Sequence, residues 1–213
     1  MSQFEFDVLI IGSGPGGYVA AIRARQLGLK TALIEKNELG GVCLNWGCIP
    51  SKSLLRSAEI LNLIKESSEH GIYVSDLKSD FGQAVNRSRK IVKKLTDGID
   101  FLLKKNHVKL ISGNCRITTQ NQVEIQETNQ KISSKNILIA TGSYPVHPDN
   151  IDFDGNKIHD SDSILKLKRF PKSIAILGAG VIGCEYSTIF ATMGIETYLI
   201  NHHHKLLQLS LIL

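Results

Sequence analysis

Residues 6–17, with the sequence FDVLIIGSGPGG, decide the fold of the first part of the chain. Residues 6–11 are a nearly unbroken apolar run, which is typical of a strand buried on both faces of a parallel sheet. A glycine-rich turn follows at once, then a helical stretch at residues 18–27 and a second apolar strand at residues 31–34. This order of strand, turn, helix and strand predicts a βαβ unit that binds a dinucleotide.

The glycines of the turn fit a bound dinucleotide. Gly12 permits the tight turn, Gly14 lets the backbone approach a pyrophosphate, and Gly17 allows the helix to pack closely on the strand. The N-terminus of the helix supplies unpaired N–H groups and partial positive charge. Glu35 ends the second strand, 18 residues after Gly17, where an acid can accept hydrogen bonds from a ribose hydroxyl. A glycine-rich turn in another doubly wound fold is the alternative interpretation.

Two cysteines, Cys43 and Cys48, lie within residues 40–52, GGVCLNWGCIPSK. The two leading glycines let the backbone lie close to a ligand, and the apolar spacing after Pro50 predicts an amphipathic helix. Cys48 would then lie near the helix N-terminus, where a thiolate is stabilised. Such a thiolate attacks disulfides or donates charge to an electron-poor ring. The spacing therefore favours redox chemistry, with inert cysteines as the plain alternative.

A zinc site is the other reading of the cysteines, and it needs about four ligands. Neither Cys115 and Cys184 nor the histidines at positions 70, 107 and 159 show paired ligand spacing. We therefore expect no metal site. Four cysteines, two of them isolated, also make a poor secreted disulfide framework, which favours a reducing compartment.

The composition is that of an ordinary globular protein, with 213 residues, 42% hydrophobic and 21% charged. The net charge of +5 comes from dispersed lysines, densest at residues 87–105, where apolar residues interleave. We interpret that stretch as a solvated helix face and expect no nucleic-acid partner. No apolar run approaches the ~18 residues of a membrane span, and residues 1–5 leave no room for a leader. These features predict a cytoplasmic protein without a membrane partner.

Beyond the cysteine segment, apolar residues at helical spacing predict a long helix from Phe81 to about Asn106. Strand-like runs follow at residues 108–111, 115–118, 123–126 and 137–140, the middle ones as an antiparallel meander. Residues 144–154 contain two prolines and several turn residues, which predicts a domain boundary. A second βαβ unit with its own glycine-rich turn follows at residues 173–200.

Asn201 stands 23 residues after Gly178, just as Glu35 stands 23 residues after Gly12. In the second unit an asparagine thus takes the position of the ribose-binding acid. Asparagine can hydrogen-bond the ribose hydroxyls, but it does not repel a 2′-phosphate, so the preference for NAD over NADP is weaker.

The first glycine-rich turn, Glu35 and residues 40–52 together resemble the pyridine nucleotide–disulfide oxidoreductases. Leu44, Ile49 and Ser51 make the dihydrolipoamide dehydrogenases the most similar group within that family. The resemblance implies an α/β fold of two Rossmann-like units for FAD and NAD(P), with three-layer ββα character and an incomplete second unit. It divides the chain into an FAD-binding domain with the redox disulfide, residues 1–147, and a partial NAD-binding domain, residues 148–213.

The resemblance also implies roles for individual residues. Cys43 would exchange with a dithiol substrate, and Cys48, its disulfide partner, would face the flavin. Lys52 would lie beside the flavin ring and pair with Glu185. The residues that the resemblance places around the cofactors are, for FAD, Gly12, Gly14, Gly17, Glu35, Lys36, Gly41, Val42, Lys52, Cys115, Thr141, Gly142 and Ser143, and, for NAD, Gly178, Gly180, Gly183 and Asn201.

The implied reaction is oxidation of protein-bound dihydrolipoamide, with NAD as the final acceptor. The implied partners are the lipoyl domains of 2-oxo acid dehydrogenase or glycine cleavage complexes, and a second copy of the chain. Family members continue beyond residue 213 into a C-terminal interface domain that carries a catalytic His and Glu. We therefore expect a truncated chain of impaired activity. A glutathione-reductase-like enzyme and a non-catalytic nucleotide-binding fragment remain as alternatives. The histidines at 202–204 are expected to be a surface end rather than a metal tract, and the apolar tail 206–213 is expected to favour aggregation.

Overall fold

The computed structural model describes residues 3–167, 169–202 and 206–207. It contains two compact units. Unit 1 comprises Met1–Cys48 and Ile91–Val146, and unit 2 comprises Ile49–Lys90 and His147–Leu213. The predicted domain limits of 1–147 and 148–213 stay a prediction. The histidine tract 202–204 and the tail 206–213 fall largely outside the described residues.

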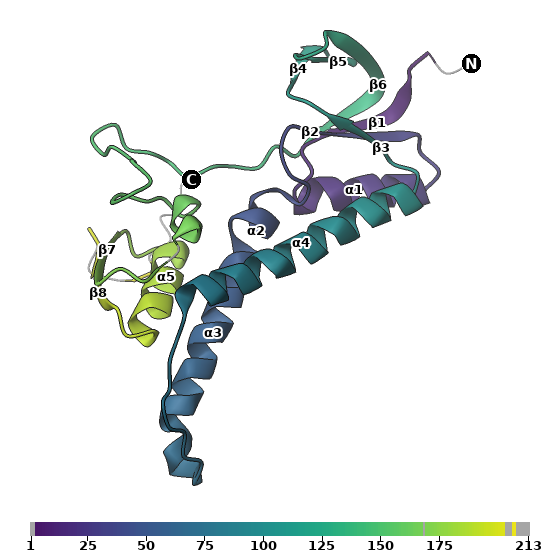
Figure 1. The fold of residues 1–213 in the computed structure, drawn as a ribbon. Helices are drawn as coiled ribbons and strands as arrows, with labels where there is room; N and C mark the ends of the chain where they lie inside the picture. The colour runs from purple at the N-terminus through teal and green to yellow at the C-terminus, as the bar shows by residue number, and fades with distance from the viewer. Residues whose placement is uncertain (1–2, 168, 203–205, 208–213) are drawn as a thin grey trace. The chain divides into compact units, whose positions relative to one another are not determined.

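Unit 1 is built on a sheet whose strands run in the order β3-β2-β1-β6-β5-β4 (Figure 1). The strands are β1 (Phe6–Ile11), β2 (Thr31–Glu35), β3 (Lys109–Ser112), β4 (Cys115–Thr119), β5 (Gln122–Ile125) and β6 (Gln130–Ile139). The first three strands and the end of β6 pair in parallel, and β4, β5 and the start of β6 pair antiparallel. The sheet is therefore a parallel Rossmann-type sheet that continues into an antiparallel meander.

β6 is longer than the sequence predicts. The sequence predicts a strand at residues 137–140, but the strand already begins at Gln130. Its first part carries lysines and serines, which hid the pattern, although Ile132 and Ser134 are buried. The first part pairs with β5, and from Ser134 onward the strand pairs with β1. One strand thus joins both sheets.

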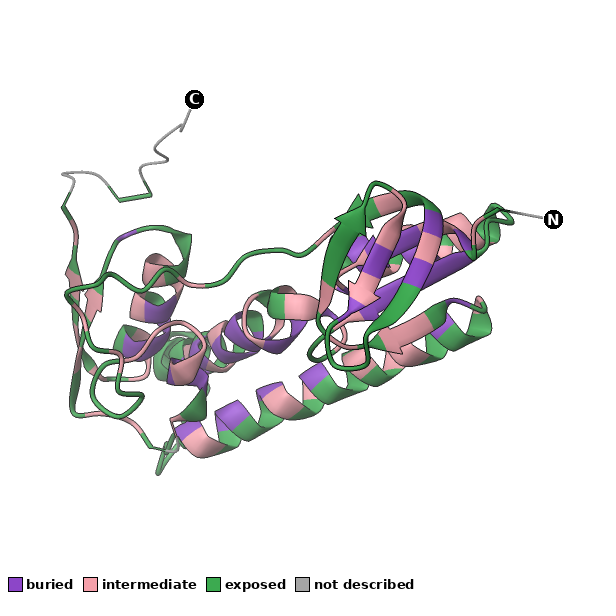
Figure 2. Cartoon of the chain, turned by 90° about the horizontal axis from the view of Figure 1, so that it is seen from above, coloured by how far each residue is buried: buried purple, intermediate pink, exposed green. Residues whose placement is uncertain are grey.

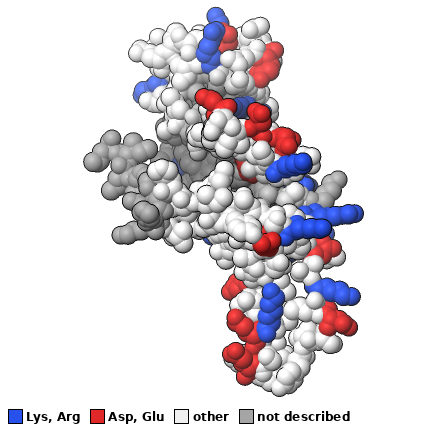
Figure 3. Space-filling model, turned by 90° about the vertical axis from the view of Figure 1, so that its left-hand side faces the viewer, with Lys and Arg blue, Asp and Glu red and all other residues white. Residues whose placement is uncertain are grey.

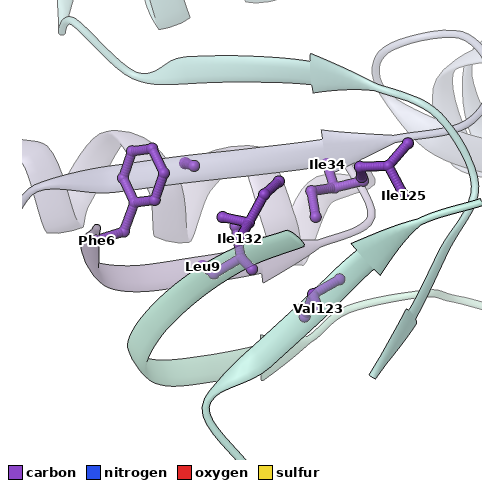
Figure 4. Packing of buried hydrophobic residues seen from close by; sticks show 7 residues of the cluster. Phe6, Leu9, Ile34, Val123, Ile125 and Ile132 are labelled. Carbon is purple, nitrogen blue, oxygen red and sulfur yellow. The ribbon is translucent and has the colours of Figure 1, made fainter. Parts of the chain in front are cut away.

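The core of unit 1 has two sides. Leu9 and Ile10 are neighbours in β1 and are both fully buried, so both faces of the strand are covered. Figure 4 shows the side that faces the meander, where a cluster of buried apolar residues gathers; its members are Phe6, Leu9, Ala32, Ile34, Val123, Ile125 and Ile132. Within unit 1, α1 (Pro15–Gln26) and residues 91–105 of α4 (Phe81–Lys105) lie on the other face of the sheet (Figure 1). Helix, parallel sheet and meander form the three expected layers.

Two helices begin earlier than the sequence predicts, and one short helix was not predicted. α1 begins at Pro15 rather than near Tyr18, because proline suits the first position of a helix. A short helix that was not predicted, α2 (Gly41–Asn45), holds Cys43. α3 (Cys48–Glu66) begins before Pro50, because a proline in the first turn removes an N–H that has no partner within the helix.

α4 (Phe81–Lys105) confirms the predicted long helix. Its buried residues follow one side of the helix (Figure 2); they are Phe81, Ala84, Val85, Ser88, Val92, Ile99 and Leu103. On the outer side Lys93 pairs with Asp97 at 2.9 Å, and Lys104 pairs with Asp100. Lys and Arg side chains stand among Asp and Glu side chains on the face drawn in Figure 3.

Unit 2 contains a second βαβ segment. It consists of β7 (Ser173–Leu177), α5 (Val181–Thr192) and β8 (Glu196–Ile200), with the two strands paired in parallel. Phe81 packs on Phe170 and Phe190, with ring centroids 4.8 Å and 5.8 Å apart. Two short 3₁₀ helices, Ser67–His70 and Ser163–Lys166, complete the unit. The two βαβ segments confirm the predicted α/β class. Among the described residues, no helix is both long and apolar enough to cross a membrane.

Candidate functional site

The first glycine-rich turn packs so closely on the sheet that two of its glycines have no room for a side chain. At a third glycine the space is open. A Cβ on Gly17 would lie 1.8 Å from the carbonyl oxygen of Gly12. Gly12 has φ +98°, and a Cβ there would lie 2.3 Å from the carbonyl oxygen of Ala140. Nothing would lie within 4 Å of a Cβ on Gly14. The turn therefore packs tightly on the sheet and presents Gly14 to a ligand.

Glu35 is held at this turn by several hydrogen bonds. Its Oε2 atom accepts from the backbone N–H and the hydroxyl of Ser13, at 2.8 Å and 2.7 Å. Its Oε1 atom accepts from the backbone N–H of Asn37 at 2.9 Å. Burial raises the pKa of Glu35, but the hydrogen bonds from Ser13, Asn37 and Lys36 outweigh burial, so the pKa lies below the usual value. The carboxylate is thus fixed in its charged form.

The segment after β6 lies against the same turn. The backbone N–H of Ala140 donates to the carbonyl of Ile11 at 2.8 Å. A Cβ on Gly12 would lie 3.1 Å from the Cα of Thr141, and Gly142 has φ +69°. Thr141, Gly142 and Ser143 are exposed. The predicted second contact segment is therefore accessible at the carboxyl end of the parallel strands, where ligands of such sheets bind.

Cys115 begins β4 near the end of β2. The backbone N–H of Gly113 donates to the carbonyl of Glu35 at 2.9 Å, which brings this segment to the same sheet edge. The carboxylate of Glu127 accepts from the backbone N–H of Asn114, at 2.9 Å and 3.1 Å. Burial, together with the negative charge of Glu127, raises the pKa of the Cys115 thiol. This thiol is therefore a poor nucleophile at neutral pH.

The glycine pair before the cysteines is docked on the turn. The backbone N–H of Gly40 donates to the carbonyl of Ser13 at 3.0 Å. A Cβ on Gly41 would lie 2.8 Å from the Cα of Gly14, and both glycines have positive φ angles, +94° and +61°. Only glycine adopts these angles without strain, so the sequence Gly-Gly fixes the approach. Val42 follows in α2 with an exposed side chain.

Asn45 holds α2 in place, and sequence reasoning missed it. Its side chain is buried, and its Nδ2 atom donates to the carbonyls of Leu39 and Gly41, at 2.9 Å and 3.0 Å. A buried amide with two backbone acceptors fixes the path of the chain around Cys43. The signal was available, because a polar residue stands between apolar neighbours in the motif.

Cys43 lies in α2, and Cys48 is the first residue of α3. All four cysteines are thiols. Burial raises the pKa of Cys43 to about 11, and a hydrogen bond with Cys48 and the negative charge of its thiolate add to the rise. Cys43 is half-buried and Cys48 is exposed. The two thiols therefore form one interacting pair in the reduced state, close enough for their ionisations to be linked.

Lys52 and Glu185 meet within unit 2. Lys52 Nζ lies 2.9 Å from Glu185 Oε1, which joins α3 to α5. The Lys52 side chain is 68% exposed and that of Glu185 is 23% exposed. A pocket of about 580 Å³ lies along the same two helices, with Lys52, Leu55 and Thr188 in its lining. The residues that line the pocket include none of either glycine-rich turn.

The second glycine-rich turn repeats the first in shape. A Cβ on Gly183 would lie 1.9 Å from the carbonyl oxygen of Gly178, and Gly178 has φ +98°. Gly180 has open space around it, as Gly14 has. Asn201 directly follows β8, at the place that Glu35 takes at the end of β2. Within the described residues, no group of three or more His, Cys, Asp and Glu side chains could hold a metal ion.

Comparisons with known proteins agree with this arrangement. Residues 6–211 match the pyridine nucleotide-disulphide oxidoreductase family. Dihydrolipoyl dehydrogenase of Chlorobaculum parvum is 43% identical over 209 residues, which are 97% of this chain and 45% of that protein. The corresponding enzyme of Acholeplasma laidlawii is 42% identical over 201 residues, 92% of this chain and 59% of that protein. This chain thus spans about half the length of these relatives.

A solved structure of a flavoprotein disulfide reductase has a similar fold. The Cu(II) complex of the HOCl-induced flavoprotein disulfide reductase RclA from Escherichia coli superposes with a TM-score of 0.82 at 27% identity, over 97% of this chain and 44% of that one. The family consists of flavin-dependent enzymes that use FAD and NAD. The predicted resemblance is therefore confirmed: this chain belongs to the pyridine nucleotide-disulphide oxidoreductase family.

Proposed function

We propose that this chain is the part of a dihydrolipoyl dehydrogenase that binds FAD and carries the redox-active cysteine pair. One observation carries the proposal: Gly41 touches Gly14 at the open nucleotide turn, and the linked thiols of Cys43 and Cys48 follow directly. The fixed approach keeps the cysteine segment at the nucleotide-binding edge of the sheet.

The residues of unit 1 fit FAD. Gly14 leaves space for a pyrophosphate at the N-terminus of α1, where N–H groups and the helix dipole favour an anion. Glu35 offers a charged acceptor for a ribose hydroxyl. The exposed backbone of Thr141 and Gly142, and that of Lys36, Val42 and Cys115, would complete the contacts. Unit 2 would hold the nicotinamide nucleotide through Gly178, Gly180, Gly183 and Asn201.

The cysteine pair would carry out the exchange with substrate. In its oxidised form, a substrate thiolate attacks Cys43 Sγ, the Cys43–Cys48 bond breaks, and Cys48 leaves as a thiolate. The second substrate thiol then displaces Cys43 from the mixed disulfide, which forms the substrate disulfide and leaves both cysteines reduced. FAD, when bound, supplies the two-electron acceptor that returns the pair to the disulfide.

The protonation of Cys43 and the charges of Lys52 and Glu185 would affect this exchange. The raised pKa of Cys43 keeps its thiol protonated at neutral pH, so a proton must be removed before Cys43 can attack in the reverse direction. Lys52 brings positive charge that favours an anionic reduced flavin, and Glu185 orients it. The partners proposed for the whole protein are lipoyl domains of 2-oxo acid dehydrogenase or glycine cleavage complexes, and a second copy of the chain.

An anaerobic single-turnover experiment tests the proposal. The FAD-loaded chain, with its cysteine pair oxidised, is mixed with one equivalent of dihydrolipoamide or two of glutathione, and new protein thiols are counted. We expect dihydrolipoamide to produce two thiols per chain. Cys43→Ser should abolish the exchange, and Cys184→Ser, whose thiol lies in α5, should leave it intact. Oxidation of glutathione alone would favour a glutathione-reductase-like enzyme, and no exchange with either thiol would favour a non-catalytic fragment.

A further inference from the structure

Ser13 lies in the first glycine-rich turn, and the proposed function gives it no role. Its side chain is fully buried, although serine is usually exposed. Its hydroxyl donates to Glu35 Oε2 at 2.7 Å, and its backbone N–H donates to the same oxygen at 2.8 Å. One residue therefore supplies two donors to one carboxylate oxygen.

This arrangement determines which oxygen of Glu35 faces a ligand. Oε2 is taken up by Ser13, while Oε1 accepts from the backbone N–H of Asn37. A carboxylate oxygen has about two acceptor positions, so the two Ser13 donors occupy those of Oε2 and make Oε1 the oxygen turned toward a further donor. The side chain cannot turn without losing charge-assisted hydrogen bonds, which are among the stronger ones in proteins.

The second turn of the same chain provides a natural comparison. Ala179 stands there in place of Ser13, and Asn201 stands in place of Glu35. The hydroxyl and the carboxylate are thus present together at one turn and replaced together at the other. Because the two backbones have the same shape, with Gly12 and Gly178 both at φ +98°, the difference lies in these side chains.

We propose that Ser13 is a positioning residue for FAD binding: its hydroxyl holds the Glu35 carboxylate turned so that Oε1 receives a ribose hydroxyl. The inference rests on the proposed function, because it takes FAD as the ligand of this turn. It assigns to Ser13 an effect on affinity that acts entirely through Glu35.

The groups that face Glu35 come from the first turn, from β3 and from the residues after β2. Ser13 comes from the turn after β1, and Ser112 of β3 pairs with Glu35 across the sheet. Lys36 and Asn37 act through backbone N–H groups. Burial raises the pKa of Glu35, and the Ser13 hydroxyl is the largest of the influences that lower it. Loss of the hydroxyl must therefore raise the pKa of Glu35.

The test compares Ser13→Ala with the unsubstituted chain in two ways. Carboxyl-carbon NMR of Glu35, recorded without ligand, gives its pKa. Quenching of flavin fluorescence gives the dissociation constant of FAD at about pH 8 and about pH 5. Ser88→Ala is the matched control, because Ser88 is also fully buried and its hydroxyl donates to the carbonyl of Val85 in α4.

We expect Ser13→Ala to raise the pKa of Glu35 and to weaken FAD binding about tenfold at pH 8, the loss expected for a charge-assisted hydrogen bond. The loss should be larger at pH 5, because more Glu35 is then protonated. Ser13→Thr, which keeps the hydroxyl, should restore much of the affinity. In a Glu35→Gln background, Ser13→Ala should change affinity by less than about twofold.

The outcomes separate the inference from the proposed function. An unchanged pKa of Glu35, or equal losses of affinity at both pH values and in the Glu35→Gln background, would overturn the role of Ser13 while FAD binding stands. If the unsubstituted chain does not bind FAD, the proposed function is wrong, and this inference is overturned with it.

Discussion

The backbone of Gly41 lies against that of Gly14, so closely that a Cβ on Gly41 would be 2.8 Å from the Cα of Gly14. This contact joins the segment before the cysteines to the turn at the nucleotide-binding edge. Position 41 requires glycine for two reasons: a Cβ would clash with Gly14, and the φ angle of +61° is strained for other residues.

Gly41→Ala should therefore displace α2 and weaken FAD binding. The positive φ and the backbone clash together should lower the free energy of unfolding by about 1–3 kcal/mol. Gly98→Ala in α4 is the matched control, because a Cβ there meets open space and replacement of a helical glycine should stabilise by about 0.5–1 kcal/mol. Urea unfolding and FAD titration measure both effects. Unchanged FAD affinity in Gly41→Ala would contradict this account of the contact.

Alkylation of Cys43 should depend on pH, because only its thiolate reacts. Burial and the neighbouring Cys48 raise its pKa to about 11, so its alkylation should accelerate up to that pH. Cys48→Ser should lower the pKa of Cys43, because the repulsion between thiolates disappears. Mass spectrometry of the Cys43 peptide after iodoacetamide treatment measures the rate. Rapid alkylation of Cys43 at pH 7 in the unsubstituted chain would contradict the raised pKa.

The raised pKa of Cys43 should also make the folded state less stable at alkaline pH. An acid whose pKa is raised on folding contributes stability that is complete below its unfolded pKa, ~8.5 for a thiol. That contribution is lost as the pH rises through about 11. Cys43→Ala should therefore reduce the alkaline loss of stability between these values, as followed by circular dichroism.

The Lys52–Glu185 pair should matter for redox potential more than for stability. Because the Lys52 side chain is 68% exposed, Lys52→Gln should lower the free energy of unfolding by no more than about 1 kcal/mol. Loss of its positive charge should lower the reduction potential of bound FAD. Lys93→Gln, which breaks the exposed pair with Asp97, should have the same small effect on stability and leave the potential unchanged. Equal potentials in both variants would remove Lys52 from the flavin site.

Asp160 should make unit 2 sensitive to acid. Burial raises its pKa, but backbone and side-chain hydrogen bonds from Ser163 and the contact with His147 at 2.8 Å lower it to about 2. Its stabilising effect is thus present above the unfolded pKa near ~3.9 and is lost as the pH falls toward about 2. Asp160→Asn should cost about 1 kcal/mol at pH 7, because a neutral acceptor replaces the charged acceptor of these hydrogen bonds.

The comparison for Asp160 is Asp154, whose pKa is also about 2 but whose side chain is exposed. Asp154→Asn should have the smaller effect on the acid unfolding midpoint, measured by near-ultraviolet circular dichroism. A larger effect of Asp154→Asn would show that burial of Asp160 does not determine the stability of unit 2 in acid.

The sequence predicted the elements whose patterns are strong and local. The apolar run of β1 and the glycine-rich turns were predicted correctly, because each reports its own backbone geometry. The first half of β6 was missed, because its lysines and serines obscure a pattern that only pairing with β5 explains.

Parts of the candidate site were also beyond sequence reasoning. Ser13 could not be recognised as a partner of Glu35, because 22 residues separate them and only folding of β1 beside β2 brings them together. Asn45 stands out in the sequence as a polar residue between apolar neighbours, but no sequence pattern reports the positions of the two backbone carbonyls to which it donates. The ion pair of Lys52 and Glu185, in contrast, was expected from the family resemblance alone.

The central claim is that the nucleotide turn and the cysteine pair belong to one flavin site, and the visible absorption spectrum tests it most directly. The purified chain is loaded with FAD and treated anaerobically with one equivalent of a dithiol. We predict a flavin band that gains long-wavelength charge-transfer absorbance on reduction, and loss of that absorbance in Cys48→Ser. A chain that stays colourless, or a flavin band without the new absorbance, would contradict the account.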